Sequence, residues 1–286
     1  MAGFQVKFAD LPGPPPFRLA YVDEGPRDAD ALLFLHGWAS THEQWSAVVE
    51  RLSKKWRCVA VDLPSYGQSE VPVTDYTLEF FARSALQLLD SIGVRRAVPV
   101  GSSMGGMVSM EFTLRWPERV EALVLVDSGG MWRPRGFARR RARSDFAFAI
   151  YKALEPVIGR SMMKRAFHDH RPGIEEMKAR AAALREDPKE RARRRTRFNS
   201  MMHVIATSYR KRAAEIRAPT LVVWGRQDRL VSLKLGERLA RTIPGARLEI
   251  IEECGHLPSV ERPGELARLV EGFLERMGDG LSFSIF

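Results

Sequence analysis

One serine of this chain stands in a setting that could make its hydroxyl a nucleophile. Ser103 is the middle residue of the sequence GSSMG at 101–105, directly after an apolar run and before a helical pattern. A strand that turns sharply into a helix holds one side chain at the tip of the turn, close to backbone N–H groups. Such a turn needs small residues two positions before and after that side chain. Glycines stand there for Ser103, whereas for Ser102 the same positions carry Val100 and Met104.

A serine hydroxyl reacts at neutral pH when a base accepts its proton and an acid orients that base. Among six histidines, His256 is the best candidate base, because it follows the strand-like run 247–252 and precedes the last helical pattern. The candidate acid is Asp228, which ends the sequence WGRQD after another strand-like run. Asp127, at the end of the preceding run, is the alternative acid. The chain order Ser103, Asp228, His256 is one of the known triad orders.

Acyl transfer also needs N–H donors for the negative oxygen that develops on the carbonyl. The N–H of Met104 follows the candidate nucleophile directly and is the first expected donor. The tripeptide His36-Gly37-Trp38 follows the apolar run 31–35, and its Trp38 N–H is the second. We predict no metal site, because His168 and His170 have no accompanying cluster of ligands.

Short strand-like runs alternate with longer helical patterns, which is typical of a mostly parallel sheet covered by helices on both faces. The predicted parallel strands are 31–35, 57–62, 97–100, 122–127, 220–224 and 247–252, and the predicted helices are 43–53, 78–92, 104–116, 233–242 and 263–277. Segments 4–8 and 18–22 are predicted to form an antiparallel pair at the edge. The fold class is therefore α/β, and the candidate site residues stand in loops that follow strands.

About 90 residues separate the run ending at Asp127 from the run beginning at Thr220, which is too long for a structureless loop. Helical patterns fill it, one of which has apolar residues at 146, 150, 154, 157 and 158. We predict a first core part at 1–130, an inserted helical cap at 131–214 and a second core part at 215–286.

The net charge of +10 is concentrated in the predicted cap, where 131–214 contains 23 Lys and Arg against 8 Asp and Glu. Such an excess can attract nucleic acid, acidic lipid or an anionic substrate. We interpret the arginines as solvated helix faces and expect no nucleic-acid partner, since no recognition motif is present. With no apolar run of 18 residues and no signal-like N-terminus, we expect a soluble cytoplasmic protein without membrane insertion. Cys58 and Cys254 are too few for a disulfide framework.

The motifs together resemble the α/β-hydrolase superfamily, in particular its single-cap, lipase- and esterase-like members. They are, in the family's order, HGW at 36–38, DLPSYGQS at 62–69, GSSMGG at 101–106, WGRQD at 224–228 and GH at 255–256. The resemblance implies that Ser103 is the nucleophile, His256 the base and Asp228 the acid beneath a helical cap. Ser65 departs from the family's usual glycine, which puts the shape of that turn in doubt. A serine at the elbow argues against dehalogenases and epoxide hydrolases, which use aspartate there.

The expected reaction is two-step acyl transfer on a carboxylic ester, with no cofactor and with a small-molecule substrate. Beside Trp38 and Met104, the predicted pocket residues are Met107, Leu257, Trp132, Phe146 and Phe148. The oligomeric state is left open between monomer and homodimer.

Two alternatives remain open within this fold. The first is hydrolysis of a carbon–carbon bond, as in the meta-cleavage hydrolases of the superfamily, although those proteins usually have tryptophan after the base histidine where this chain has Leu257. The second is a non-catalytic ligand-binding homologue.

Overall fold

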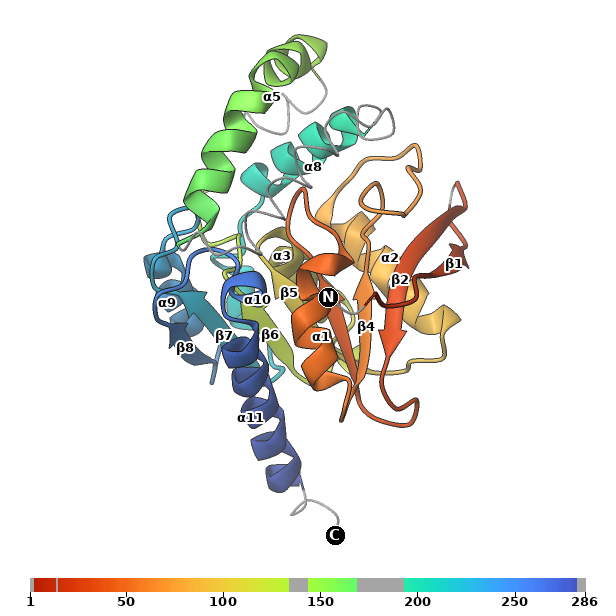
Figure 1. Ribbon diagram of the computed structural model, residues 1–286, viewed down its shortest axis with the longest axis vertical. Coiled ribbons are helices and arrows are strands. Elements are labelled where there is room, and N and C mark those ends of the chain that lie inside the picture. Colours follow the sequence, from red (N-terminus) through yellow and green to blue (C-terminus); the bar gives the residue numbers. More distant parts are fainter. Residues whose placement is uncertain (1–2, 14, 134–143, 169–192, 282–286) are drawn as a thin grey trace.

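A single eight-stranded sheet forms the centre of the computed structural model (Figure 1), which describes residues 3–13, 15–133, 144–168 and 193–281. The strand order is β1-β2-β4-β3-β5-β6-β7-β8. Strands β3 to β8 run parallel to one another, whereas β2 pairs antiparallel with both β1 and β4. The bounds are β1 Lys7–Leu11, β2 Phe17–Glu24, β3 Ala31–Leu35, β4 Arg57–Val61, β5 Ala97–Ser102, β6 Leu123–Val126, β7 Thr220–Gly225 and β8 Arg247–Ile251.

The predicted mostly parallel sheet is confirmed, and the predicted parallel strands agree with β3 to β8 to within two residues at each end. The exception is the antiparallel edge, where the first strand was predicted at 4–8 and lies at Lys7–Leu11. The short connection after β1 places Leu11 opposite Phe17. Both of these side chains are buried, so burial at the turn, rather than the apolar residues before Lys7, sets the start of the pair.

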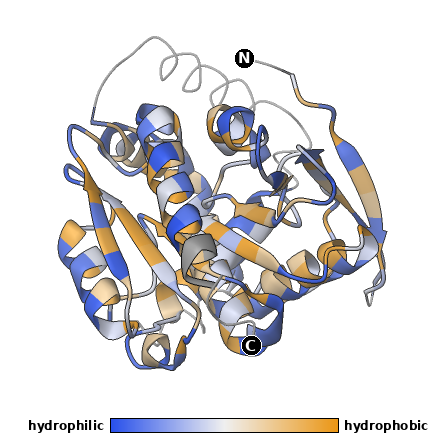
Figure 2. Cartoon of the chain, turned by 90° about the horizontal axis from the view of Figure 1, so that it is seen from below, coloured by the Kyte–Doolittle hydropathy of each residue, from blue (hydrophilic) through white to orange (hydrophobic). Residues whose placement is uncertain are grey.

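Helices cover both faces of the sheet, and each face has its own hydrophobic core (Figure 2). Alternate residues of β3 belong to different cores. Leu33 and Leu35 lie in one core, and Leu32 and Phe34 lie in the other. Helices α1 (Ser46–Leu52) and α11 (Pro263–Leu281) pack on one face, and α2 (Leu78–Ser91), α3 (Met104–Arg115) and α9 (Leu233–Thr242) pack on the other. Shorter helices are η1 (His42–Trp45), η2 (Pro117–Arg119), η3 (Arg212–Glu215) and α10 (Pro258–Glu261).

Two helices between β6 and β7 lie beyond the sheet at the end of the molecule opposite the tip of α11 (Figure 1). They are α5 (Asp145–Ala166) and α8 (Arg194–Ala206). Phe148 and Tyr151 of α5 pack on Phe198 of α8, with ring centroids 5.6 and 5.2 Å apart. The helical character of this insertion is as predicted, while its role as a cap remains a prediction. Among the described residues, none of the helices is long and apolar enough to cross a membrane.

Candidate active site

Ser103 occupies a strained turn between β5 and α3. Its φ of 54° and ψ of −112° lie where side-chain-bearing residues are seldom found. The turn is possible because of the flanking glycines. A Cβ atom on Gly101 would lie 2.3 Å from the carbonyl oxygen of Gly105, and one on Gly105 would lie 2.0 Å from that of Leu35. The predicted turn around Ser103, and the reason for its glycines, are therefore present in the structure.

His256 and Asp228 form a buried hydrogen-bonded pair. The Nδ1 atom of His256 lies 2.7 Å from Oδ2 of Asp228, and both side chains are almost fully buried. The other carboxylate oxygen, Oδ1, accepts the N–H groups of Leu230 at 2.7 Å and Val231 at 2.9 Å. Three donors thus hold the Asp228 carboxylate. With Nδ1 donating to Asp228, Nε2 of His256 is left as a proton acceptor.

Asp127 is the second carboxylate at this point. It follows β6, has a φ of 44°, and is fully buried. Its Oδ1 accepts the N–H of Gly225 at 3.0 Å, whereas its Oδ2 has no hydrogen-bond donor among the described residues. Burial, and then the nearby Asp228, raise the pKa of Asp127 well above its usual range. Since Asp228 has three donors and Asp127 has one, a single negative charge is better stabilised on Asp228.

The candidate nucleophile and base lie at the same edge of the sheet. The Ser103 N–H donates to the carbonyl of Val126 at 3.0 Å, one residue before Asp127. Asp127, in turn, has a carboxylate oxygen within 4.8 Å of a ring nitrogen of His256. The hydrogen bond from Ser103 to His256 that proton transfer requires is not formed in this structure. Such bonds often tighten only when substrate binds.

The two backbone N–H groups predicted as oxyanion donors belong to turns beside Ser103, and their role remains a prediction. Met104 is the first residue of α3, where backbone N–H groups have no helical partner. The turn containing Trp38 lies against the nucleophile, because a Cβ atom on Gly37 would be 3.4 Å from Cβ of Ser103. Within the described part of the chain, neither the Met104 nor the Trp38 N–H donates to a backbone carbonyl. Both are therefore suited to an oxyanion.

Glu261 is a site feature that the sequence reasoning missed. This buried carboxylate accepts the N–H of Gly255 at 2.9 Å and that of His168 at 2.8 Å. Beside it, the N–H of His256 donates to the carbonyl of Ala166 at 2.7 Å. The loop of the candidate base is thus tied directly to the end of α5. A glutamate in a four-residue helix carries no sequence signal that would have predicted this role.

The predicted pocket residues fall into different places. Met107 is fully buried, and both it and Trp132 lie against Gly129, just after β6. Leu257 packs in a small cluster with Ala166 and Phe167. These side chains are at the site end of the molecule, and their contact with substrate remains a prediction.

The two phenylalanines of α5 do not line the site together. Phe148 packs on Phe198 and carries Arg195 over its ring at 4.8 Å, so it belongs to the packing between α5 and α8. Phe146 is 76% exposed. Residues two positions apart on a helix point about 200° apart, so Phe146 faces away when Phe148 faces α8. The predicted contact of Phe146 with substrate remains a prediction.

Ser65 adopts the strained turn that its departure from glycine suggested. Its φ is 72°, in the left-handed region. Its hydroxyl is hydrogen-bonded to that of Thr196 on α8. Nearby, the Tyr66 hydroxyl pairs with Ser200 at 2.9 Å, and Arg193 donates to the carbonyls of Gly67 and Ser69. This turn therefore anchors α8.

Trp38 and Trp132 hold α8 from the core side. The indole N–H of Trp38 donates to the carbonyl of Arg197 at 2.9 Å, and that of Trp132 donates to the carbonyl of Ile205 at 3.3 Å. Both bonds use main-chain acceptors on α8, so they do not depend on that helix's side chains. The Trp38 indole thus links α8 to the turn that lies against Ser103.

Asp127, Asp228 and His256 are also close enough to share a metal ion, since their donor atoms lie within 4.8 Å of one another. Nδ1 of His256 is already paired with Asp228, and both oxygens of Asp228 accept hydrogen bonds. These contacts fit an acid and base pair better than a ligand set.

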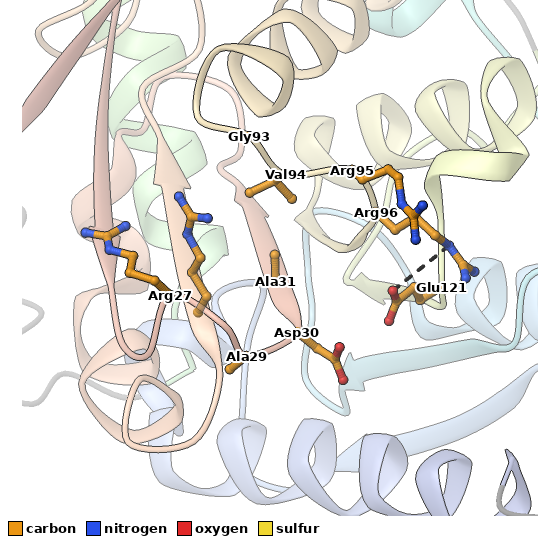
Figure 3. A pocket seen from close by; sticks show the side chains of 10 residues that line it. Arg27, Ala29, Asp30, Ala31, Gly93, Val94, Arg95, Arg96 and Glu121 are labelled. Carbon is orange, nitrogen blue, oxygen red and sulfur yellow. Dashed lines mark ion pairs between the residues drawn. The ribbon is translucent and has the colours of Figure 1, made fainter.

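A pocket of about 250 Å³ lies at the opposite edge of the sheet, near the start of β3 (Figure 3). Four arginines line it. Arg27 and Arg57 are ion-paired with Asp23, and Arg96 donates to the carbonyl of Val120 and approaches Glu121 at 4.0 Å. Only Arg95 makes no ion pair among the described residues. The pocket lies away from the strand ends that carry Ser103, Asp228 and His256, and we do not assign the site to it.

Comparison with known families agrees with this geometry. Residues 30–263 match the family model described as the alpha/beta hydrolase fold. The chain belongs to this family. Among α/β-hydrolase relatives, a 2-hydroxy-6-oxononadienedioate/2-hydroxy-6-oxononatrienedioate hydrolase of Burkholderia vietnamiensis is 32% identical, with 91% of each chain covered. A monoacylglycerol lipase of Xenopus laevis is 27% identical over 96% of this chain and 83% of its own length.

Solved structures show the same α/β-hydrolase architecture. A thermophilic esterase from Thermogutta terrifontis superposes with a TM-score of 0.80 at 24% identity, over 95% of this chain and 98% of the esterase. At that identity the likeness shows the fold alone. The fold and hydrolase family predicted from the motifs are thus confirmed.

Proposed function

We propose that this chain is a serine hydrolase that cleaves carboxylic esters of small to medium apolar compounds. The observation that carries the proposal is the buried His256–Asp228 hydrogen bond at the same sheet edge as the strained Ser103 turn. A pair of this kind has one purpose in acyl transfer, which is to accept the proton of a hydroxyl nucleophile.

The proposed reaction has two steps. Ser103 Oγ attacks the ester carbonyl carbon while Nε2 of His256 takes the hydroxyl proton, and the carbonyl oxygen becomes negative between the N–H groups of Met104 and Trp38. The C–O bond then breaks, and His256 returns the proton to the departing alcohol. In the second step, water gives a proton to His256 as its oxygen attacks the acyl carbon. His256 then passes this proton to Ser103 Oγ as the acyl–Oγ bond breaks, which releases the carboxylic acid and restores the serine.

The apolar character of the substrate is proposed from the residues around the site. Met107 and Trp132 lie together beside Gly129, and Leu257 directly follows the base. The nearby arginines Arg194 and Arg197 of α8 are both ion-paired with Glu155. With those guanidinium groups engaged, an uncharged ester suits this end of the molecule better than a substrate with a free carboxylate.

Carbon–carbon bond hydrolysis is the second candidate, and the relatives favour it. The Burkholderia vietnamiensis relative carries the name of a 2-hydroxy-6-oxononadienedioate/2-hydroxy-6-oxononatrienedioate hydrolase. A Comamonas testosteroni relative, 29% identical, carries that of a 2-hydroxy-6-oxo-6-phenylhexa-2,4-dienoate hydrolase. The same nucleophile and base could serve both reactions, so the choice depends on substrate binding. Leu257 in place of the meta-cleavage tryptophan weighs against this candidate.

A direct comparison of turnover separates the two candidates. The purified protein and its Ser103→Ala variant are each assayed with p-nitrophenyl butyrate and with 2-hydroxy-6-oxo-6-phenylhexa-2,4-dienoate. We expect ester turnover that Ser103→Ala removes, and slower turnover of the dienoate. Turnover of the dienoate alone would overturn the ester proposal and support the carbon–carbon one. Turnover of neither, with Ser103 unreactive, would support a binding protein.

A further inference from the structure

Helix α5 has apolar side chains on two sides. Its inner side, with Phe148 and Tyr151, packs on α8. The opposite side, here called the outer face, consists of Phe146, Ile150, Leu154 and Val157, which are 76%, 47%, 48% and 56% exposed. Their spacing of three to four residues places them in one stripe. A helix that is apolar on both sides is normally covered on both.

The charges around the outer face are positive. The two acidic residues of α5 are both ion-paired, Asp145 with Arg195 and Glu155 with Arg194 and Arg197. In contrast, the cations Arg160 and Lys164 of the same helix are exposed, and at about 100° of turn per residue they lie on or beside the outer face. An apolar stripe accompanied by lysine and arginine is typical of a helix that lies in the plane of a membrane surface.

The charge also decides between possible occupants of this face. A second copy would bring together two segments that each contain 23 Lys and Arg against 8 Asp and Glu, and these would repel one another. Nucleic acid would satisfy the cations but leave the apolar stripe in water. An anionic lipid surface satisfies both, because the headgroups attract the cations and the acyl region takes up the apolar side chains.

We propose that the outer face of α5 docks onto an anionic lipid surface. Helix α5 lies at the end of the molecule opposite the tip of α11 (Figure 1), and its outer-face side chains are exposed. Its last residue, Ala166, accepts the N–H of His256, so docking would hold the candidate site close to the lipid. That consequence for substrate access rests on the proposed function, whereas the docking itself does not.

Vesicle flotation tests the proposal. The full chain is mixed with vesicles of phosphatidylcholine alone or with 30% phosphatidylglycerol added, at low and high salt. We expect binding to the anionic vesicles that weakens as salt rises. Ile150→Ser with Leu154→Ser should weaken it by about tenfold or more, because two apolar side chains no longer enter the acyl region. Ser103→Ala should bind like the wild type, which separates docking from catalysis.

The matched control is Val71→Ser with Val73→Ser. It also removes two exposed apolar side chains, which are 40% and 91% exposed, but they lie outside α5. It should leave vesicle binding unchanged. If the α5 variant does not fold by circular dichroism, the double reversal Arg160→Glu with Lys164→Glu replaces it and should abolish binding. The proposal is overturned if the wild type ignores anionic vesicles, or if the folded variants bind as it does. A dimer in sedimentation that the α5 variant dissociates would assign the face to a second copy instead.

Discussion

The carboxylates of Asp127 and Asp228 have oxygens within 4.8 Å of each other, at the buried ends of two neighbouring strands. Two negative charges so close in a buried place are unfavourable, so we expect the pair to share one proton. The raised pKa of Asp127 and the three donors around Asp228 place that proton on Asp127. We therefore propose that Asp228 is the carboxylate that orients His256.

This assignment predicts unequal effects for two isosteric substitutions. Asp228→Asn should lower kcat by about 10⁴, because an amide no longer favours the His256 tautomer that has its proton on Nδ1. Asp127→Asn should leave kcat within a few-fold of the wild type, since asparagine resembles the neutral acid and its oxygen can still accept the Gly225 N–H. Steady-state ester kinetics measure both variants. The reverse order of effects would transfer the role of the acid to Asp127.

Glu261 is predicted to position the base loop without touching the substrate. Glu261→Gln leaves one acceptor oxygen for the two N–H groups of Gly255 and His168. One buried donor then loses its partner, which costs about 1–3 kcal/mol. We expect kcat to fall by about tenfold with a lower unfolding free energy, and the pH profile of kcat to change. Unchanged kinetics in a destabilised variant would limit Glu261 to a structural role.

The turn around Ser103 should tolerate no side chain at its first glycine. Gly101→Ala places a methyl group 2.3 Å from a main-chain oxygen that cannot move aside. We expect a loss of about 3 kcal/mol or more in unfolding free energy, measured by urea denaturation. The control is Gly272→Ala in α11, where the added methyl group meets only the flexible side chain of Arg276. That variant should be equally or slightly more stable, and equal behaviour of the two variants would contradict the proposed geometry.

Much of this arrangement could be predicted from the sequence, and the limits have physical causes. Strands β3 to β7 are buried on both faces, so their apolar runs mark them almost residue by residue. The edge strand β1 alternates exposed Phe8 with buried Ala9, and its start was misplaced. The outer face of α5 shows another limit, because periodicity reveals that a helix face is apolar but not what covers it.

The site also has residues that the sequence could predict and a choice that it could not settle. Ser103, Asp228 and His256 could be proposed because each stands in a loop after a strand, and parallel strand ends meet at one edge. Asp127 and Asp228 could not be separated, since both satisfy that rule. The two carboxylates differ in the number of N–H groups around each, and this number depends on the folded backbone rather than on sequence position.

Acid should weaken the fold partly through His36. Burial lowers the pKa of this imidazole to about 4. Unfolding returns the pKa to about 6.5, so the unfolded state binds more protons between these values. The unfolding free energy is therefore highest above pH 6.5. It falls by up to about 3 kcal/mol as the pH drops toward 4.

Two variants isolate this contribution. His36→Gln should reduce the pH dependence of the unfolding free energy between pH 6.5 and 4, measured by urea denaturation. His168→Gln, at an exposed histidine, should leave it unchanged. The interpretation fails if His36→Gln has the same pH dependence as the wild type.

The most direct measurement is to map the residue that a fluorophosphonate modifies, by peptide mass spectrometry on the wild type, Ser103→Ala and Ser102→Ala. Ser102 is the matched control, because it is the adjacent buried serine and its hydroxyl makes no hydrogen bond within the part of the chain that the structure describes. The account predicts modification of Ser103 in the wild type and in Ser102→Ala, no modification in Ser103→Ala, and a loss of ester turnover of about 10⁶ in that variant alone. Ester turnover that persists in Ser103→Ala, or a label on any other residue, would contradict it.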